Sequence, residues 1–496
     1  MLPDIVRRLK MHLDLRGRAN TLWHHALGED FLEPHELKKN RTLRYGRWTS
    51  GGTGRLILGI GLTAAAAMSI GCNRRPNVET APVVEFSREI APIAPPVIAD
   101  GDWPWWRGPT RNGVARGTAP VTWNSEEGIV WKTAVPGRGH SSPTVVGNRI
   151  FLATADDDRQ IQSVLAFDRD TGKQLWQTPV LTGNFPVPAQ MHPKSTHANG
   201  TVACDGERLF IAFLNDNKIS ATALNREGEI LWQQKLGDYS PRFGYAPSPC
   251  VHGSLVLFAA DHAEGGFLAG VHRETGETVW MKSRPKADSY SSPVVASIGG
   301  RDGLFLSGAN LVAAYDPLTG KELWTYPGTA ASTCGTCVWD DTYVVASGGY
   351  PDKQTIALTA DGRPIWNNPT CCYEQSMLID AGHVYAADDG GILHCWEIAT
   401  GNERWKARLG GPISASPVLA NGNLYITNER GATFVVAADP AEFRKLGENQ
   451  LGTEAFATPT ICGGRIYHRA ATVEEGARQE WLYCIGNPSH DAPGDG

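Results

Sequence analysis

Short runs of apolar residues, several of them alternating with polar ones, fill most of the chain from about residue 128 onward. Residues 149–153 (Arg-Ile-Phe-Leu-Ala) and 423–427 (Asn-Leu-Tyr-Ile-Thr) are two runs of strand length. A period of two is typical of β-strands, because successive side chains point to opposite faces of a sheet. The pattern therefore predicts an all-β protein built from many short strands.

One stretch, residues 314–324 (Ala-Tyr-Asp-Pro-Leu-Thr-Gly-Lys-Glu-Leu-Trp), shows how two of these strands are joined. We expect the Asp316 carboxylate to accept hydrogen bonds from the backbone of the turn, and Gly320 to take the left-handed conformation that closes it. Trp324 follows four residues later and brings a large ring whose N–H needs a partner. The stretch therefore predicts a β-hairpin.

The same stretch recurs with variations, and each copy ends in a tryptophan, or in Phe443 for one degenerate copy, at intervals of 38 to 56 residues. A unit of about 40 to 45 residues holds four short strands and their turns, which is the size of one propeller blade. We expect the tryptophans to dock neighbouring blades by filling the gaps between them. They are Trp131, Trp176, Trp232, Trp280, Trp324, Trp366 and Trp405.

The two ends of the repeat array predict the number of blades. Residues 128–135 form a Trp-ended strand with no blade before it, whereas residues 457–486 supply three strands and lack a fourth. We expect the first strand to complete the last blade, which gives an eight-bladed propeller of four-stranded antiparallel blades over residues 101–486. Each unit is expected to open with an inner strand of small residues, such as 141–146 or 414–418, because the axis is crowded.

Charge and cysteine content narrow the possible functions. Residues 1–55 carry eleven Lys and Arg against six Asp and Glu, so the rest of a chain with net charge −6 is acidic. A mildly acidic body argues against nucleic-acid binding, which usually needs a basic face. Ten cysteines in 496 residues do not make a disulfide scaffold.

A membrane-targeting segment is predicted near the N-terminus, after a basic region over residues 1–54. Residues 55–72 begin with Arg55 and continue with seventeen uncharged, mostly apolar residues, as in an export signal or a membrane anchor. Gly71-Cys72 looks like the lipid-attachment box of bacterial lipoproteins. Three alternatives stay open: a lipoprotein modified at Cys72, an uncleaved anchor that acts as a transmembrane helix, and simple secretion. Each places the propeller outside the cytoplasm.

The segments next to the propeller are predicted to have little structure of their own. Residues 73–100 contain five prolines and no usable period, so they are expected to form an extended tether. Residues 103–109 (Trp-Pro-Trp-Trp-Arg-Gly-Pro) are too apolar for a free linker and are expected to cap the folded body. Residues 487–496 are expected to be a flexible tail.

The Ala-x-Asp-x-x-Thr-Gly-x-x-x-Trp unit resembles the repeat of eight-bladed propellers of the pyrroloquinoline-quinone type. The resemblance covers residues 101–486, and the lead-in at residues 103–109 looks like that of envelope proteins of this family. The family contains both quinone-dependent alcohol dehydrogenases and the non-catalytic lipoprotein of the outer-membrane β-barrel assembly machinery. The resemblance therefore implies the fold and leaves the activity open.

The dehydrogenases of this family hold the quinone at the axis on a tryptophan floor, with Ca²⁺, an aspartate base and a disulfide between adjacent cysteines. Cys371-Cys372 is such an adjacent pair, but it precedes the sixth unit, whereas the family pair sits in an early one. We therefore assign it no catalytic role and keep two alternatives, an oxidised redox pair and two inert thiols. Cys334 and Cys337 precede the fifth unit. One disulfide could join this pair to Cys371-Cys372, or the four thiols could bind a zinc ion, although their spacing does not match a zinc knuckle.

Histidines supply the remaining candidate site. His192 and His197 lie in the longest interval of the repeat, between Trp176 and Trp232, where a propeller insertion places binding residues. His140 and His262 could join them on one rim to bind a metal, although histidines in polar loops are usually only solvated. No Ser-His-Asp grouping or phosphate-binding loop stands out.

Two hypotheses follow from these observations. The first is a non-catalytic, membrane-tethered propeller, monomeric and without a cofactor, whose rim binds proteins or peptides on the periplasmic side of the cell envelope. The second is a pyrroloquinoline-quinone-dependent dehydrogenase with bound calcium that oxidises an alcohol or a polymer. The functional residues are expected in the insertion between residues 177 and 231, in the cysteine-bearing loops of units five and six, and in the axial funnel.

Overall fold

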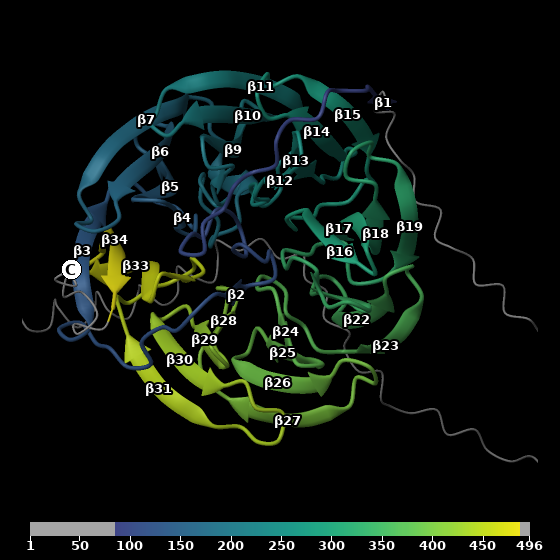
Figure 1. The fold of residues 1–496 in the computed structure, drawn as a ribbon. Coiled ribbons are helices and arrows are strands. Elements are labelled where there is room, and N and C mark those ends of the chain that lie inside the picture. Colours follow the sequence, from purple (N-terminus) through teal and green to yellow (C-terminus); the bar gives the residue numbers. More distant parts are fainter. Residues whose placement is uncertain (1–84, 487–496) are drawn as a thin grey trace, which may run out of the picture. The chain divides into compact units, whose positions relative to one another are not determined.

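The computed structural model describes residues 85–486, which form a ring of eight β-sheets around a central axis (Figure 1). The chain divides into two compact units, residues 1–72 and 73–496, and the described residues belong to the second. The predicted basic region, the apolar segment with Cys72 and the C-terminal tail lie outside the described residues. None of the helices found among residues 85–486 has the length and apolar character that a transmembrane span requires.

Each sheet has four principal strands that follow one another from the axis to the perimeter, and we number the sheets as blades 1 to 8. Blade 1 contains β4 (Thr144–Val146), β5 (Arg149–Asp156), β6 (Ile161–Asp168) and β7 (Gln174–Thr182). Blade 2 contains β8 (Ala203–Cys204), β9 (Arg208–Asn215), β10 (Lys218–Asn225) and β11 (Ile230–Asp238). Blade 3 contains β12 (Cys250–His252), β13 (Leu255–Ala260), β14 (Phe267–His272) and β15 (Thr278–Ser283). Blade 4 contains β16 (Val294–Ile298), β17 (Arg301–Gly308), β18 (Leu311–Tyr315) and β19 (Glu322–Pro327).

The second half of the ring repeats this arrangement. Blade 5 contains β20 (Val338–Trp339), β21 (Tyr343–Gly348), β22 (Gln354–Thr359) and β23 (Pro364–Asn368). Blade 6 contains β24 (Leu378–Asp380), β25 (His383–Ala387), β26 (Ile392–Glu397) and β27 (Glu403–Arg408). Blade 7 contains β28 (Val418–Ala420), β29 (Asn423–Thr427), β30 (Ala432–Ala437) and β31 (Lys445–Gln450). Blade 8 contains β32 (Thr460–Cys462), β33 (Arg465–Glu474) and β34 (Ala477–Ile485), with β3 (Ile129–Val135) as its outer strand.

The composite eighth blade confirms the predicted closure of the ring. Strand β3 pairs antiparallel with β34, with Trp131 opposite Cys484, so the two ends of the array share one sheet. Figure 1 shows β3 in blue beside the yellow β34. Closure by a shared sheet leaves no unpaired blade edge between the first and last units of the repeat. The all-β, eight-bladed fold predicted from the repeat is therefore confirmed.

The repeated turn has the geometry that its sequence predicts. In blade 4 the Asp316 carboxylate accepts hydrogen bonds from the backbone N–H groups of Leu318 and Thr319, both at 2.9 Å. Gly320 has φ of 70°, in the left-handed region that favours glycine. The turn thus joins β18 to β19 and carries Trp324 to the perimeter.

The tryptophans of the repeat contact the turn of the following blade. Each of the seven indole N–H groups donates to a backbone carbonyl of that turn, at 2.6 to 3.2 Å. For six of the seven, the glycine of the turn lies so close to the ring that a β-carbon would come within 3 Å of it. The exception is Trp405, which faces the degenerate copy at Phe443 where the glycine is missing.

A hub closes one end of the axis. It consists of residues 103–115, which begin with the predicted tryptophan-rich cap and include the short strand β2 (Val114–Ala115). Hydrogen bonds and strand pairing join the hub to the inner edges of seven blades. The residues contacted, one from each of blades 1 to 7, are Val145, Cys204, Val251, Val295, Trp339, Met377 and Leu419.

Part of the segment predicted as an extended tether packs against the ring. The strand β1 (Phe86–Ser87) pairs antiparallel with β15 and adds a fifth strand to blade 3. Farther along, Ile93 N–H donates to Ser254 Oγ at 2.8 Å. The prolines keep the chain extended, as predicted, but residues 86–98 run along the blades because their isoleucines pack against the cores.

The inner strands begin later than predicted. The small residues of 141–146 and 414–418 lie mainly before the strands, which start at Thr144 in blade 1 and at Val418 in blade 7. The prolines that precede the strands lack an N–H for ladder pairing, so the chain is still irregular there. The serines before them are therefore free to line the axis.

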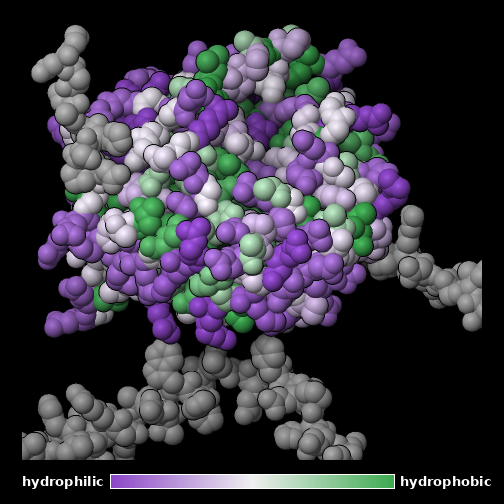
Figure 2. Space-filling view, turned by 60° about the horizontal axis from the view of Figure 1, so that its bottom comes forward, coloured by the Kyte–Doolittle hydropathy of each residue, from purple (hydrophilic) through white to green (hydrophobic). Residues whose placement is uncertain are grey.

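One side of the described part has a mainly polar surface (Figure 2). Figure 2 shows hydrophobic residues as scattered patches among hydrophilic ones on one side of the described part. Several exposed apolar side chains precede a repeat tryptophan, for example Leu175, Leu231 and Leu323. Scattered apolar residues of this kind are normal on soluble surfaces, so we assign them no site.

Candidate functional site

The two faces of the ring differ because successive strands in a blade run in opposite directions. The hub and the Asp-x-x-Thr-Gly turns lie on one face, which we call the hub face. On this face the turn that contains Arg169 lies beside the β4–β5 turn, because the Arg169 side chain donates to the Gly147 carbonyl at 3.0 Å. The connections between blades lie on the other face. We call this the pocket face, because it holds a cavity of about 170 Å³ at the axis, the axial pocket.

A ring of hydroxyl groups surrounds the axis just before the inner strands. The ring has one Ser or Thr from each blade. At seven steps between neighbouring blades, the backbone N–H of this residue donates to the hydroxyl oxygen of the corresponding residue in the next blade, at 2.9 to 3.1 Å. One of these steps, from Thr458 N–H to Ser142 Oγ at 3.0 Å, joins blade 8 to blade 1, and among these described residues the step from Ser292 to Thr336 lacks such a bond. The members of the hydroxyl ring are Ser142, Thr201, Ser248, Ser292, Thr336, Ser376, Ser416 and Thr458.

The wall of the axial pocket follows from this ring. The residue two positions before each ring hydroxyl lines the pocket, which gives one wall position per blade. In blade order the wall residues are His140, Asn199, Ala246, Tyr290, Cys334, Glu374, Ser414 and Phe456. Because the eight positions carry eight different side chains, the repeat builds the frame of the site while the wall residues give it an asymmetric chemistry.

The hub supplies one side chain to the pocket. Trp106 lines the cavity and donates its indole N–H to Thr336 Oγ1 of the hydroxyl ring at 2.8 Å. Its neighbour Arg107 is buried and donates to the carbonyls of Met377 and Pro417 at 2.6 and 2.7 Å. These bonds fix the indole at the axis from the hub side.

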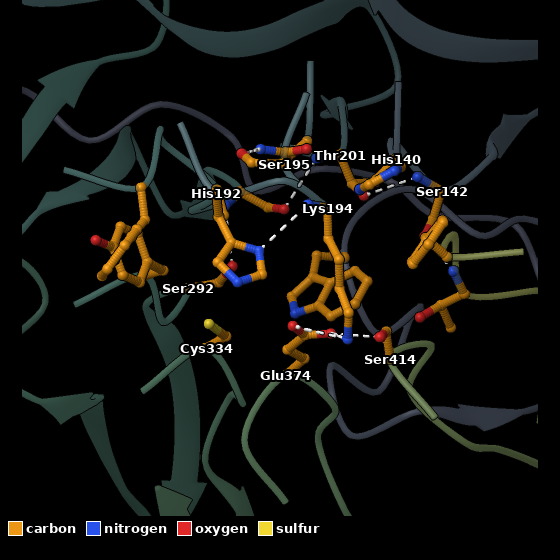
Figure 3. A pocket seen from close by; sticks show the side chains of 18 of the residues that line it. His140, Ser142, His192, Lys194, Ser195, Thr201, Ser292, Cys334, Glu374 and Ser414 are labelled. Atoms are coloured by element: carbon orange, nitrogen blue, oxygen red, sulfur yellow. Dashed lines mark hydrogen bonds and ion pairs between the residues drawn. The ribbon is translucent and has the colours of Figure 1, made fainter. Parts of the chain in front are cut away.

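Residues 183–202 connect blades 1 and 2, and we call them the insertion loop. The loop contains the 3-10 helix η1 (Pro188–Gln190) and supplies the Lys194 ammonium to the pocket. Figure 3 shows the Lys194 side chain crossing the pocket to Glu374 and Ser414. The Lys194 ammonium lies 2.6 Å from Glu429 Oε1 and 3.4 Å from Glu374 Oε2. Ser414 Oγ is also within hydrogen-bond distance of both carboxylates. The insertion loop is thus tied across the axis to blades 6 and 7.

Electrostatics fix the charge states of two groups in the pocket. Burial would lower the pKa of Lys194, but hydrogen bonding to Glu429 and the charge of Glu374 raise it, so the ammonium stays charged. Burial, together with the guanidinium charges of Arg138 and other arginines, lowers the pKa of His140 well below its usual value. His140 is therefore a neutral ring at neutral pH, and it stacks on Phe456 with centroids 4.6 Å apart.

The loop that carries Cys371 and Cys372 is held by one carboxylate. Asp389 accepts from the Tyr373 backbone N–H at 2.8 Å and from the Cys371 thiol at 3.0 Å. This places Tyr373 and Glu374 in the pocket, whereas neither Cys371 nor Cys372 is among the residues that line it. Both cysteines are free thiols, and burial raises the pKa of each.

The structure separates the four histidines that the sequence singles out. His140 and His192 line the axial pocket, whereas His197 packs on Phe185 with ring centroids 4.2 Å apart. His262 packs on Tyr239 at 5.0 Å. Among residues 85–486 no group of three or more His, Cys, Asp or Glu side chains has the arrangement of a metal site. Cys334 and Cys337 are also free thiols, so neither the histidine nor the zinc hypothesis gains support here.

The donor set of the axial pocket does not fit the quinone and calcium that the family resemblance implies. Ca²⁺ takes six to eight oxygen ligands, usually with several carboxylates. The pocket wall carries one carboxylate, Glu374, and the ammonium of Lys194 already lies 3.4 Å from it. The wall therefore lacks the set of oxygen ligands that Ca²⁺ needs, and no step of chemistry is assigned to such a group.

Most residues of the pocket escape prediction from single motifs. The insertion loop, the loops of units five and six and the funnel were expected to carry function, and the axial pocket brings Lys194, Cys334 and Glu374 from these regions together. The individual residues Trp106, Tyr290 and Phe456 were not identified. The wall residues all stand two positions before the Ser or Thr that precedes an inner strand, and this spacing in the sequence would have identified them.

Comparison with known proteins gives a family match over most of the ring. The family model described as "Outer membrane protein assembly factor BamB" matches residues 113–187, 160–370 and 352–442. Together these ranges cover more than half of the chain.

Individual relatives carry two different names. The chain is 25% identical to a quinoprotein ethanol dehydrogenase of Pseudomonas aeruginosa over 54% of its own length and 41% of that protein. It is 24% identical to the outer membrane protein assembly factor BamB of Bordetella pertussis over 64% of its own length and 77% of that protein. Among solved structures, a europium-containing methanol dehydrogenase aligns with a TM-score of 0.59 and 12% identity, over 78% of this chain and 98% of the other. That level of identity shows a shared fold alone.

Proposed function

The chain belongs to the family whose model is described as the outer membrane protein assembly factor BamB, and from this premise we propose that its propeller is a protein-binding scaffold of the cell envelope. In this role it binds other proteins during outer membrane protein assembly and catalyses no reaction itself. The observation that carries the proposal is the ion pair of Lys194 with Glu374 and Glu429, which occupies the axis where the family's dehydrogenases need free metal ligands.

The pocket face is the side on which we place the partner. The insertion loop stands on this face and exposes Val187, whose accessible fraction is 57%. Lys194 ties the loop to blades 6 and 7, so the loop presents a fixed surface at low entropic cost on binding. Loops on a rigid scaffold are the usual position of binding residues.

Site-specific photo-crosslinking tests this placement. A photoreactive side chain at Val187 on the pocket face is compared with one at Leu318, which is 52% exposed in a turn on the hub face. We expect crosslinks from Val187 to an outer membrane assembly protein, and none from Leu318. Deletion of the gene should also lower the amount of folded outer membrane β-barrel protein. Equal crosslinking at both positions, with unchanged β-barrel levels, would refute the proposal.

Membrane attachment is a separate part of the proposal and concerns residues 55–72. We propose that this apolar segment carries the propeller to the periplasmic side of the envelope and holds it there, through a lipid on Cys72 or as an uncleaved anchor. Metabolic labelling with a radioactive fatty acid tests the two forms. Label that disappears in the Cys72→Ala variant supports a lipoprotein, and unlabelled protein in the membrane fraction supports an anchor. Wild-type protein found only in the soluble fraction contradicts both.

A quinone-dependent dehydrogenase is the alternative, and the 25% identity to a quinoprotein ethanol dehydrogenase favours it. Under this alternative, the full chain incubated with pyrroloquinoline quinone and Ca²⁺ should retain the quinone on desalting and reduce an artificial dye with an alcohol. Under our proposal it retains no quinone. Quinone retention at one equivalent together with alcohol-dependent dye reduction would replace the scaffold proposal.

A further inference from the structure

Two carboxylates, Glu374 in the pocket wall and Glu429 beside it, share the ammonium of Lys194. Lys194 is the only lysine or arginine among the described residues that line the cavity, and it faces both Glu374 and Glu429. Within this group of three side chains, one ammonium faces two carboxylates. The side chains of Glu374 and Glu429 are 24% and 14% exposed, so water and solutes reach them.

Hydrogen bonding within the pocket leaves part of this charge unsatisfied. Ser414 lies within reach of both carboxylates, but its hydroxyl has one proton and can donate to only one of them at a time. Lys194 lies closer to Glu429, at 2.6 Å, than to Glu374, at 3.4 Å. Glu374 is therefore the carboxylate with free acceptor capacity on the side of the cavity.

The rest of the wall suits a cation better than an anion. Five aromatic side chains line the cavity, namely Trp106, Phe243, Tyr290, Tyr373 and Phe456. Aromatic faces attract ammonium groups through the negative potential of the ring. Tyr290 is 5% exposed, and its hydroxyl finds no hydrogen-bond partner among the described residues. A buried hydroxyl without a partner is unfavourable, so a ligand N–H that bonds to it would remove a cost.

The protein already shows which group the carboxylates bind. The occupant in this structure is a lysine side chain that reaches across the axis from the insertion loop. The cavity of about 170 Å³ remains beside it, well above the roughly 10 to 15 Å³ that a single water needs. There is therefore room for a second group of similar size.

We propose that the axial pocket binds a primary alkylammonium group, with Glu374 as its carboxylate partner, the Tyr290 hydroxyl as a second acceptor and the aromatic wall around its alkyl chain. Lys194 acts as an internal competitor for the same carboxylates. The inference does not depend on the scaffold function, because a free amine and the lysine side chain of a bound protein present the same group. A monocation and Lys194 together balance the charge of Glu374 and Glu429, whereas a divalent ion and Lys194 would exceed it.

Titration of the full chain with small amines tests the proposal by calorimetry. The probes are n-butylamine and Nα-acetyl-lysine amide, with n-butanol and butyrate as neutral and anionic counterparts. We expect saturable one-to-one binding of both amines and none of the counterparts. Nα-acetyl-lysine amide binding at least tenfold more tightly than n-butylamine indicates a protein side chain as the natural ligand, and equal affinities indicate a free amine.

Variants assign the binding to the pocket. Glu374→Gln should weaken amine binding at least tenfold, and Tyr290→Phe several-fold because it keeps the ring and removes the acceptor. Lys194→Met should strengthen binding at least tenfold, since removal of a competitor raises the competent fraction. Glu227→Gln, at a position 64% exposed on a turn of the hub face, is the matched control and should change nothing.

Three results would overturn the inference: butyrate binding as tightly as butylamine, affinity unchanged in Glu374→Gln, or no saturable amine binding in Lys194→Met. Circular dichroism establishes that each variant is folded. If Glu374→Gln does not fold, Glu429→Gln and the salt dependence of wild-type binding take its place. Affinity that is unaffected by both would equally contradict the proposal.

Discussion

Trp324 and Gly362 form the contact that joins blade 4 to blade 5. A β-carbon built on Gly362 would lie 2.6 Å from Cδ2 of the Trp324 ring, and the indole N–H donates to the carbonyl of Ala360 in the same turn at 2.9 Å. In the six turns that keep it, the glycine is therefore required twice, once for the left-handed turn and once for the tryptophan of the preceding blade. The two most constant residues of the repeat act on each other across the blade boundary.

Gly362→Ala should cost more stability than the same change at Gly382. Both glycines have positive φ, 82° and 77°, so both variants carry backbone strain of about 1 kcal/mol. Only Gly362 faces a ring, and overpacking there should add about 1 to 3 kcal/mol. Urea denaturation of the two variants measures the difference, and equal midpoints would show that the ring contact is not tight.

Loss of a repeat tryptophan should open a cavity between blades. Trp280 is fully buried and donates to the Pro317 carbonyl at 3.2 Å, so Trp280→Ala should cost about 3 to 5 kcal/mol. Trp324 is only partly buried, and Trp324→Ala should cost somewhat less. Leu323→Ala, at a position 51% exposed, is the control and should change stability by less than about 0.5 kcal/mol. Unchanged thermal stability of both tryptophan variants would contradict a docking role.

The hub should contribute strongly through Arg107. Its guanidinium donates to three carbonyls, those of Met377, Pro417 and Asn112, and Arg107→Met leaves these buried acceptors without a partner. We expect a loss of at least about 3 kcal/mol, since each unsatisfied buried group costs about 1 to 3 kcal/mol. Arg88→Met removes an arginine whose side chain is 59% exposed and should cost little. A similar effect of both changes in thermal unfolding would argue against the hub.

His468 should make the protein less stable at acidic pH. Burial lowers its pKa to about 4, and neither ring nitrogen has a partner among the described residues. Between pH 6.5 and 4 the unfolded chain binds a proton there that the folded chain does not, so the free energy of unfolding falls as the pH falls. The loss from this residue should reach about 3 kcal/mol and level off below pH 4.

A His468→Phe variant isolates this contribution. The side chain lies in an apolar environment that includes Trp123, Tyr425 and Ile466. Chemical denaturation at a series of pH values should show a flatter profile for the variant than for the wild type between pH 4 and 6.5. Parallel profiles would mean that other groups cause the acid sensitivity.

Cys371 and Cys372 should be unreactive in the folded protein. Burial raises the pKa of both thiols, and for Cys371 the hydrogen bond to the Asp389 carboxylate raises it further. Because the thiolate is the nucleophile, iodoacetamide at pH 8 should label neither residue until guanidinium chloride unfolds the chain. Rapid labelling of the folded protein, or a disulfide between the two residues in mass spectrometry, would instead support the redox alternative.

The architecture of the propeller could be predicted from the sequence alone. The spacing of the tryptophans, the Asp-x-x-Thr-Gly turn and the unmatched strand at 128–135 predicted eight blades and the closure by β3, because each feature depends on contacts within a blade or between successive blades. The tryptophan-rich lead-in was also recognisable as part of the folded body, since its apolar surface needs burial. These are local signals, and local geometry suffices to interpret them.

The composition of the site, in contrast, depends on how the closed ring brings distant residues together. Lys194 and Glu374 are 180 residues apart, and Lys194 and Glu429 are 235 apart, yet the closed ring brings all three to one axis. No periodicity along the chain encodes such a contact, because the wall has one position per blade and a different side chain at each. The path of residues 86–98 along the blades could not be predicted from the sequence either. A proline-rich composition predicts an extended chain, but it does not indicate the surface against which the chain packs.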